Sequence, residues 1–244
     1  MNTLSKIIFK VDAKAEKRIA PYFLKNRKYN LTGMDEYSKY IRDFPELEKT
    51  KTLPLNEAKK ILFKFIDEYY KKNYNELILK KEEIENLWKE SSEEFFESVV
   101  KVFNGHPWPK GKYSANLSIF SMFRLKPGTK VFSIPIEDTG GYKDATGHIK
   151  YTLTHELMHI YVEDYYHKYF KNRLEKSKYY DFLEIMNFIV LNLPEIKKHA
   201  IWFTNPYPSH MQRCSYAQKL YSECKNMKEF VEKLIVYLNK TEEK

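Results

Sequence analysis

The segment His155-Glu156-Leu157-Met158-His159 contains the residue types and the spacing that most directly predict chemistry in this chain. Side chains four positions apart on a helix project from the same face, so both imidazoles can bind one divalent ion. Glu156 then lies at the rim of that site, where its carboxylate can take a proton from a water molecule. The HExxH pattern therefore predicts zinc-dependent hydrolysis, with His155 and His159 as metal ligands and Glu156 as general base.

The residues around this motif predict a buried helix. Leu153, Leu157 and Ile160 follow the i, i+4, i+7 spacing of an apolar helical face. Residues 144–146 and Thr152 are both plausible starting points for the helix, because each offers residue types that cap helices. The motif is therefore expected on a helix that packs into a core.

Zinc held by two histidines requires a third protein ligand, with the fourth position left for water. Glu184 is the best candidate because it lies in a nearly all-apolar segment, residues 180–191. A carboxylate on such a helix is costly to bury unless it is paired or bound to a metal. The alternative is that Glu184 lies at the solvent-facing edge of the helix. Glu195, which follows a proline at a helix end, is a weaker candidate.

The motif and this later glutamate resemble one class of zinc enzymes. A metzincin would carry glycine and histidine where this chain has Val162 and Tyr165, and the inverted HxxEH motif is absent. Residues 151–191 resemble the gluzincins, the HExxH metallopeptidases typified by thermolysin, whose third ligand is a glutamate on a later helix. The resemblance implies a zincin-like fold, one Zn²⁺ ion per chain and hydrolysis of peptide bonds.

Two departures from thermolysin concern the third ligand and its surroundings. The connection from His159 to Glu184 is longer than in thermolysin. Phe188 stands where thermolysin-like enzymes have an aspartate that supports a zinc histidine. Asn187 or Asp181 is expected to orient an imidazole instead. These departures leave open an alternative function, a metal-binding regulatory or protein-interaction module with weak or no peptidase activity.

The resemblance also implies a donor that stabilises the oxyanion, usually a tyrosine or histidine in a segment after the third ligand. Residues 200–216 supply several such side chains, and two prolines predict a rigid loop there. His210 is the preferred donor, with Tyr207 and Tyr216 as further candidates. The alternative is that His210 is a solvated loop residue.

A β-hairpin is predicted upstream of the motif. Residues 116–124 and 129–136 alternate apolar and polar side chains, and the Pro-Gly turn between them favours antiparallel pairing. Pro135 cannot donate a ladder hydrogen bond, which argues for a sheet edge at that end. Gluzincins hold an extended peptide by adding it as another strand at such an edge. An ordinary hairpin that covers the core is the equally supported alternative.

The length and composition fit an α+β fold that is mainly helical, with a small antiparallel sheet beside the motif helix. The chain has 244 residues, 43% of them hydrophobic, which is enough for a core. Residues 1–103 are expected to form a mostly helical N-terminal region, in which residues 5–12 include a short strand. They would serve as scaffold, recognition or latency segment. Residues 104–244 are expected to form the zincin-like catalytic region, ending in a helix over residues 215–239.

Charge and cysteine content limit the expected partners and compartment. The formal net charge is +9, but lysines alternate with glutamates and no nucleic-acid-binding signature occurs, so a nucleic-acid partner is not expected. The expected partner is a peptide or protein substrate. Two cysteines do not indicate a disulfide framework. Because no signal peptide or membrane span is visible, a cytoplasmic protein is expected. No pattern in the chain specifies an oligomeric state.

Overall fold

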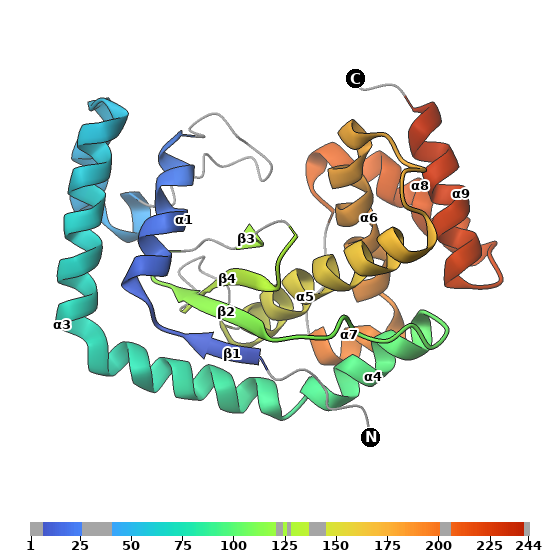
Figure 1. The fold of residues 1–244 in the computed structure, drawn as a ribbon, viewed down its shortest axis with the longest axis horizontal. Helices are drawn as coiled ribbons and strands as arrows, with labels where there is room; N and C mark the ends of the chain where they lie inside the picture. The colour runs from blue at the N-terminus through green and yellow to red at the C-terminus, as the bar shows by residue number, and fades with distance from the viewer. Residues whose placement is uncertain are drawn as a thin grey trace. The chain divides into compact units, whose positions relative to one another are not determined.

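The computed structural model describes residues 7–25, 41–120, 124–125, 128–136, 145–200 and 206–241 (Figure 1). The chain forms two compact units. Unit 1 contains Lys89–Gly111 and Leu153–Lys244, and unit 2 contains Lys6–Trp88 and Lys112–Thr152. The chain therefore passes between the units repeatedly, whereas the sequence suggested one boundary near residue 103.

A small mixed sheet forms the centre of unit 2. Its strands follow the order β1 (Ile7–Lys10), β2 (Tyr113–Ser118), β4 (Val131–Pro135) and β3 (Arg124–Leu125). β2 pairs in parallel with both β1 and β4, and only β3 runs antiparallel to its neighbour. All six residues of β2 are buried, as expected for a strand flanked by two others.

The predicted antiparallel hairpin is therefore wrong for the main pairing. β2 ends at Ser118, whose hydroxyl accepts a hydrogen bond from the Phe120 amide at 3.1 Å, and the chain bends there. Among the described residues of the expected hairpin, only the two-residue β3 pairs in antiparallel orientation, with Phe132 and Ser133 of β4. Polar residues alternate along β2 as they would on a half-exposed strand. In the structure they are buried, so alternation did not indicate the pairing partner.

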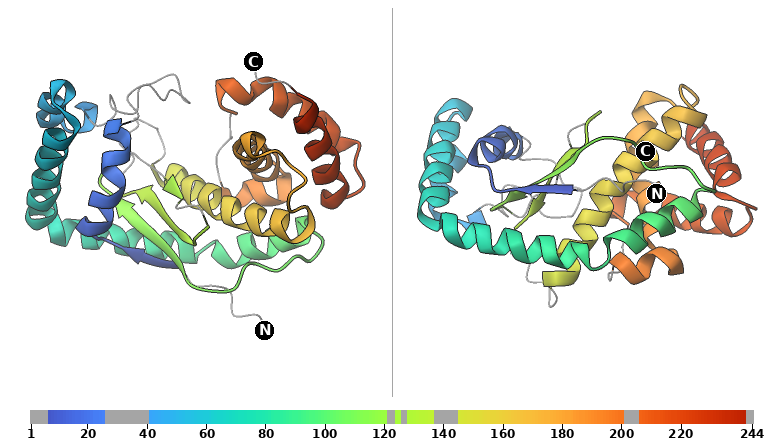
Figure 2. Two further views of the ribbon diagram at one scale, coloured as in Figure 1. Left: turned by 45° about the horizontal axis from the view of Figure 1, so that its top comes forward. Right: turned by 60° about the horizontal axis from the view of Figure 1, so that its bottom comes forward.

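Two helices of unit 2 are connected to the sheet through a buried carboxyl group. Glu16 lies on α1 (Ala13–Lys25) and accepts hydrogen bonds from the Ser118 hydroxyl at 2.8 Å and the Tyr70 hydroxyl at 3.0 Å. Tyr70 lies on α3 (Leu55–Lys89). Figures 1 and 2 show α1 beside the first part of α3, where Lys17 and Asp67 form an ion pair. One carboxyl group thus links three elements of unit 2.

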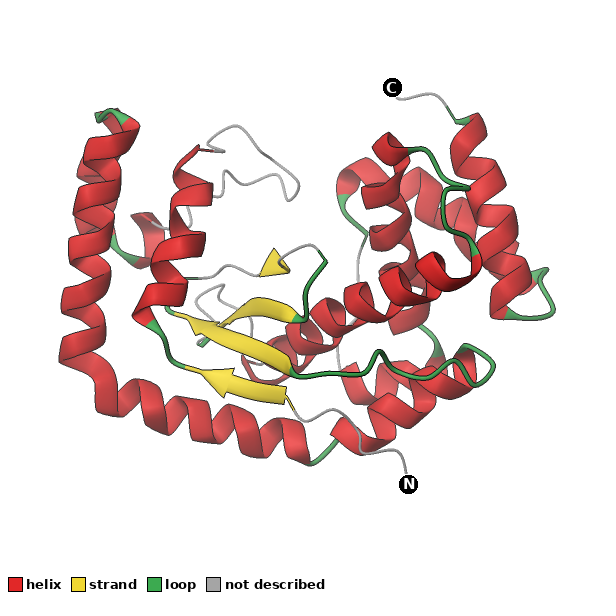
Figure 3. Cartoon of the chain, in the orientation of Figure 1, coloured by secondary structure: helices red, strands yellow, loops and turns green. Residues whose placement is uncertain are grey.

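The other described elements of unit 2 are mostly helical. A 3₁₀ helix, η1 (Pro45–Thr52), precedes α3, as the helical colouring of Figure 3 shows. Aromatic rings next to it form a cluster of edge-to-face and tilted contacts with centroid distances of 4.9–6.3 Å. The members of this cluster are Phe44, Phe65, Tyr69 and Phe120.

Unit 1 is built from packed helices. They are α4 (Ser92–Val102), α6 (Tyr179–Leu191), α7 (Pro194–Ala200), α8 (Met211–Ser222) and α9 (Met227–Lys240), together with most of α5. α6 contacts α7, α8 and α9, which explains why a nearly all-apolar segment forms it. The prediction of a helix over residues 180–191 is confirmed.

The motif helix, α5, extends over Ala145–Tyr169. Its first residue falls within the predicted starting region of residues 144–146. Every residue from Thr152 to Val162 is buried, so the expectation of a core helix is confirmed. The part of α5 that carries the motif belongs to unit 1.

Predictions for the two ends of the chain have different outcomes. The strand expected within residues 5–12 corresponds to β1, and α1, α3 and α4 are helices in the region 1–103, which was expected to be mostly helical. The single helix predicted over residues 215–239 is instead two helices, α8 and α9. Asn226 separates them because its side chain accepts a hydrogen bond from the Glu229 amide and caps α9. Among the described helices, none combines the length and apolar character needed to cross a membrane.

Candidate metal centre

Three side chains of unit 1 converge on one point. His155 and His159 lie one turn apart on α5, and their Nε2 atoms are 3.1 Å apart. From α6, Glu184 places Oε1 at 3.4 Å from the His159 Nε2 and Oε2 at 3.7 Å from the His155 Nε2. Ligand bonds of about 2.1 Å in a tetrahedral zinc site place ligand atoms about 3.4 Å apart. The observed separations therefore fit three ligands of one tetrahedral ion.

A hydrogen bond from a side chain of α6 to the backbone of α5 holds the two helices together beside the three side chains. Asn187 lies three residues after Glu184 on α6, and its Nδ2 donates a hydrogen bond to the His155 carbonyl oxygen at 3.1 Å. Both partners are buried, so water does not compete for this bond. Asn187 was expected to contact an imidazole. It instead binds the main chain of α5 and so fixes α6 against α5.

The charges of two of the three side chains suit metal binding, which requires deprotonated donors. For the third, His159, burial lowers the pKa, but the carboxylates around it, Glu184 foremost, outweigh burial and raise it. Burial lowers the pKa of His155 to about 4, with a further lowering from His159 and an opposing effect from Glu184. For Glu184, burial would raise the pKa, but the charges and hydrogen bonds of its neighbours outweigh burial and lower it to about 2. His155 is therefore a neutral donor and Glu184 a carboxylate at neutral pH.

Glu156 has a different environment although it lies in the same buried region. Its Oε2 has no hydrogen-bond partner among the described residues, and the side chain is buried. Burial, with a smaller contribution from the charge of Glu184, raises the pKa of Glu156 to about 7, while His159 opposes the shift. A carboxyl group with this pKa can both accept and release a proton near neutral pH.

His210 belongs to a charged network next to the third ligand. It ends a short 3₁₀ helix, η3 (Pro208–His210), and its Nε2 lies 2.9 Å from Asp181 Oδ1. Asp181 precedes Glu184 by about one turn of α6 and also forms an ion pair with Arg213 of α8. His210 is buried, and its Nδ1 has no partner within the described part of the chain. The prediction of a solvated loop histidine is thus excluded, and Asp181 orients His210.

The expected support of a ligand imidazole by Asn187 or Asp181 is therefore wrong. Asn187 binds main chain and Asp181 binds His210, because the two residues point along different sides of α6. His159 Nδ1 is buried without a hydrogen-bond partner among the residues that the structure describes.

The two tyrosines proposed from the sequence lie in different places. The Tyr207 ring lies against His210, with ring centroids 6.0 Å apart. Tyr216 is stacked on Tyr237 of α9 at 3.9 Å and is half-exposed. The structure thus brings Tyr207 to His210, whereas the contact recorded for Tyr216 is with α9.

Tyr180 is a neighbour of the site that the sequence did not indicate. Tyr180 precedes Glu184 by about one turn of α6 and contributes to the lowered pKa of that carboxyl group. Its ring centroid lies 6.3 Å from that of His210. The available signal was the i, i+4 spacing from Glu184, which is informative only after the third ligand has been identified.

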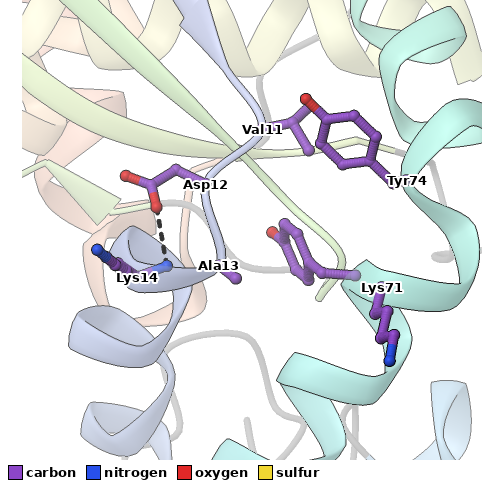
Figure 4. Close-up of a pocket in the computed structure, with 7 residues that line it drawn as sticks. Val11, Asp12, Ala13, Lys14, Lys71 and Tyr74 are labelled. Carbon is purple, nitrogen blue, oxygen red and sulfur yellow. Dashed lines mark hydrogen bonds between the residues drawn. The ribbon is translucent and has the colours of Figure 1, made fainter.

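Unit 2 contains a separate pocket of about 610 Å³ (Figure 4). Asp12 at its edge accepts a hydrogen bond from the Lys14 amide and thereby caps α1. Lys14 and Lys71 line the pocket, but Figure 4 shows their ammonium groups pointing away from each other. The pocket therefore does not gather a set of groups that could catalyse a reaction.

No protein family, curated protein or solved structure matches this chain. The site is consequently described by its own geometry. Within the described residues, His155, His159 and Glu184 form the group whose ligand atoms all lie within 4.8 Å of one another. Two histidines and a carboxylate leave one position of a tetrahedral ion open, which is the donor set of a hydrolytic zinc site.

Proposed function

We propose that the protein is a zinc-dependent peptidase of gluzincin type. The observation that carries this proposal is the convergence of buried His155, His159 and Glu184. Glu156 lies between the two histidines on α5, and its Oε2 has no hydrogen-bond partner among the described residues. The distances between the donor atoms of the three converging side chains suit Zn²⁺. The substrate would be a peptide or protein.

Each side chain has a role in this proposal. Zinc supplies Lewis acidity, which polarises the scissile carbonyl and makes a bound water a stronger acid. Glu156 accepts the proton of the attacking water and delivers it to the leaving amine. His155, His159 and Glu184 hold the ion.

His210 is the proposed donor to the oxyanion of the substrate. Asp181 fixes one nitrogen of the imidazole, which leaves Nδ1 as the nitrogen without a described partner. A donor held in advance stabilises developing negative charge without reorganisation. Tyr207, packed against His210, would restrict rotation of the ring.

Metal analysis and turnover test the proposal together. The wild-type protein should contain about one zinc ion per chain, and the His155→Ala variant should lose it. Glu156→Gln should retain zinc but lose peptide hydrolysis by a factor of about 10²–10⁴, the usual contribution of a general base. The matched control is Glu163→Gln. Glu163 lies on the same helix and accepts a hydrogen bond from the Tyr179 hydroxyl, so this variant should keep full activity. Equal hydrolysis by wild type and Glu156→Gln would refute the proposed chemistry.

A second function is favoured by one observation. Zinc histidines nearly always donate their second ring nitrogen to an oxygen, yet His159 Nδ1 has no partner among the described residues. A metal-binding regulatory or protein-interaction module without turnover would tolerate a ligand histidine that lacks this second hydrogen bond. Such a module would bind zinc through the same three ligands but would leave a diverse peptide library uncleaved, with or without Glu156.

A further inference from the structure

Away from the metal centre, a serine, a histidine and a glutamate of unit 1 lie next to one another. Glu94 and Ser98 are four positions apart on α4, so their side chains share one face of that helix. His199 lies on α7, which packs against α4 (Figure 1). The Ser98 Oγ is 3.3 Å from the His199 Nε2, and the Glu94 Oε2 is 3.9 Å from the His199 Nδ1. One ring nitrogen therefore faces a hydroxyl and the other faces a carboxylate.

This arrangement can make the serine hydroxyl a nucleophile. At 3.9 Å the Glu94 charge is too distant for a hydrogen bond, but it attracts a proton on the His199 Nδ1. The Nε2 of a neutral His199 is then the nitrogen that can accept the proton of the Ser98 hydroxyl. His199 is 5% exposed, so the packing around it holds the ring in place. Ser98 is half-buried, so part of its side chain is open to solvent.

The helix limits the bonds that this hydroxyl can cleave. The backbone amides around Ser98 lie within α4, where helical hydrogen bonds occupy them, so they cannot stabilise an oxyanion. Cleavage of an amide depends strongly on such stabilisation. An ester whose alcohol is a good leaving group depends on it less. The geometry therefore fits reactive esters, such as aryl esters, and not peptides.

We propose that Ser98 is a nucleophile that accepts the acyl group of aryl esters, with His199 as its general base. The Ser98 Oγ bonds to the acyl carbon, and the bond from that carbon to the aryl oxygen breaks. His199 takes the Ser98 proton at Nε2 and gives it to the leaving oxygen. Water then releases the acyl group as a carboxylic acid by the same proton transfers. Glu94 acts through His199 and is a positioning residue.

Labelling with a fluorophosphonate is the first test. Ser98 would form a phosphonate ester and release fluoride, and mass spectrometry of peptides locates the modified residue. Ser98 should react about 10²–10⁴-fold faster than Ser92, the usual contribution of a general base. Ser92 is the internal control because its hydroxyl donates to the Lys89 carbonyl oxygen. The difference between the two serines should vanish in His199→Gln and in wild-type protein unfolded by urea.

Turnover of an ester is the second test. Folded wild-type protein should release a burst of about one p-nitrophenolate per chain from p-nitrophenyl acetate, as expected when an acyl-enzyme accumulates. Ser98→Ala should abolish the burst, and Ser92→Ala should retain it. A wild-type protein without a burst would overturn the ester chemistry.

The role of the Glu94 charge is tested by salt. Glu94→Gln should slow the labelling of Ser98 by about 2–5-fold, the effect of an exposed ion pair. Higher ionic strength should slow the wild type toward the rate of this variant, because salt screens exposed charges. Glu93→Gln, an exposed carboxylate at the preceding position of α4, is the matched control and should behave as wild type. Equal salt dependence in wild type and Glu94→Gln would show that the charge of Glu94 has no role.

A chelator separates this inference from the proposed peptidase. Labelling of Ser98 should proceed at the same rate with the chelator present, whereas zinc-dependent hydrolysis of peptides should stop. Rapid labelling of Ser98 that His199→Gln abolishes supports the inference, even if no peptide is cleaved. Labelling of folded wild-type protein no faster at Ser98 than at Ser92 overturns it, even if zinc binding and peptide hydrolysis are found.

Discussion

Glu156 and Glu184 lie in the same buried region, yet their pKa values move in opposite directions. Burial raises the pKa of both groups. The imidazoles next to Glu184 more than compensate for burial and lower its pKa to about 2, whereas Glu156 reaches about 7. Glu184 is thus ionised at neutral pH, as cation binding requires, whereas Glu156 can exchange a proton at that pH. This difference arises from position alone, since the residue type is the same.

Replacement of the third ligand gives a direct test at this scale. Glu184→Ala should reduce zinc affinity by more than the roughly 10–100-fold that loss of an outer partner costs. The matched control is Glu195→Ala, which changes an exposed carboxylate of the same unit. Chelator competition measures both affinities. Undiminished affinity in Glu184→Ala would show that another group completes the site.

The contact between Asp181 and His210 predicts a separate effect on turnover. Asp181→Asn removes the negative charge that holds the imidazole, so kcat/KM should fall about 10–100-fold while zinc content stays constant. Asp164→Asn is the control, because Asp164 holds His106 at 3.0 Å in the same way on another part of α5. Peptide hydrolysis and metal analysis of both variants check this prediction. An equal loss of activity in the two variants would indicate a general structural effect.

At the scale of elements, local capping explains where one predicted helix divides into two. Apolar spacing continues from α8 into α9, so periodicity alone predicts one helix. Asn226 interrupts it with an extended backbone and a side chain that accepts a hydrogen bond from the Glu229 amide at 3.0 Å. Asparagine is a common helix cap, and this signal was present in the sequence but was outweighed by the apolar pattern.

The cap predicts a measurable contribution to stability. Asn226→Ala should lower the free energy of unfolding by about 1 kcal/mol, because a backbone amide at the start of α9 loses its partner. Ser91→Ala is the matched control, since Ser91 precedes α4 without a side-chain capping bond. Urea denaturation of both variants measures the difference. A loss for Ser91→Ala as large as that for Asn226→Ala would contradict the capping argument.

At the scale of the whole molecule, a contact could be predicted from the sequence when its residues are close together in the chain. The relation between His155 and His159 is contained in one helix, so spacing alone predicts it. Glu184 could be found because an acidic residue in an apolar helix needs a partner. The contact between the Tyr180 and His210 rings could not be predicted, since these residues are distant in sequence and meet only in the folded chain. The parallel pairing of β2 likewise depends on contacts distant in sequence.

A buried carboxyl group outside the metal centre makes the stability of unit 2 depend on pH. Burial raises the pKa of Glu16 to about 7, although hydrogen bonds from Ser118, Tyr70 and the Ile119 backbone oppose the shift. The folded form therefore binds the proton more tightly than the unfolded chain, whose glutamate has a pKa of 4.5. The resulting stabilisation is complete below pH 4.5 and is lost as pH rises through about 7. The shift corresponds to about 3 kcal/mol, at about 1.4 kcal/mol per pKa unit.

The Glu16→Gln variant removes this titration while keeping the shape and an acceptor oxygen. Wild-type protein should lose stability between pH 5 and pH 8 relative to this variant, by an amount that approaches about 3 kcal/mol. Urea denaturation at both pH values, with chelator present to exclude metal effects, measures the difference. Glu57→Gln, an exposed carboxylate in the first turn of α3, is the control and should follow the wild-type pH dependence. If wild type and Glu16→Gln show parallel pH profiles, Glu16 is ionised throughout that range. The hydrogen bonds around Glu16 would then lower its pKa by more than burial raises it.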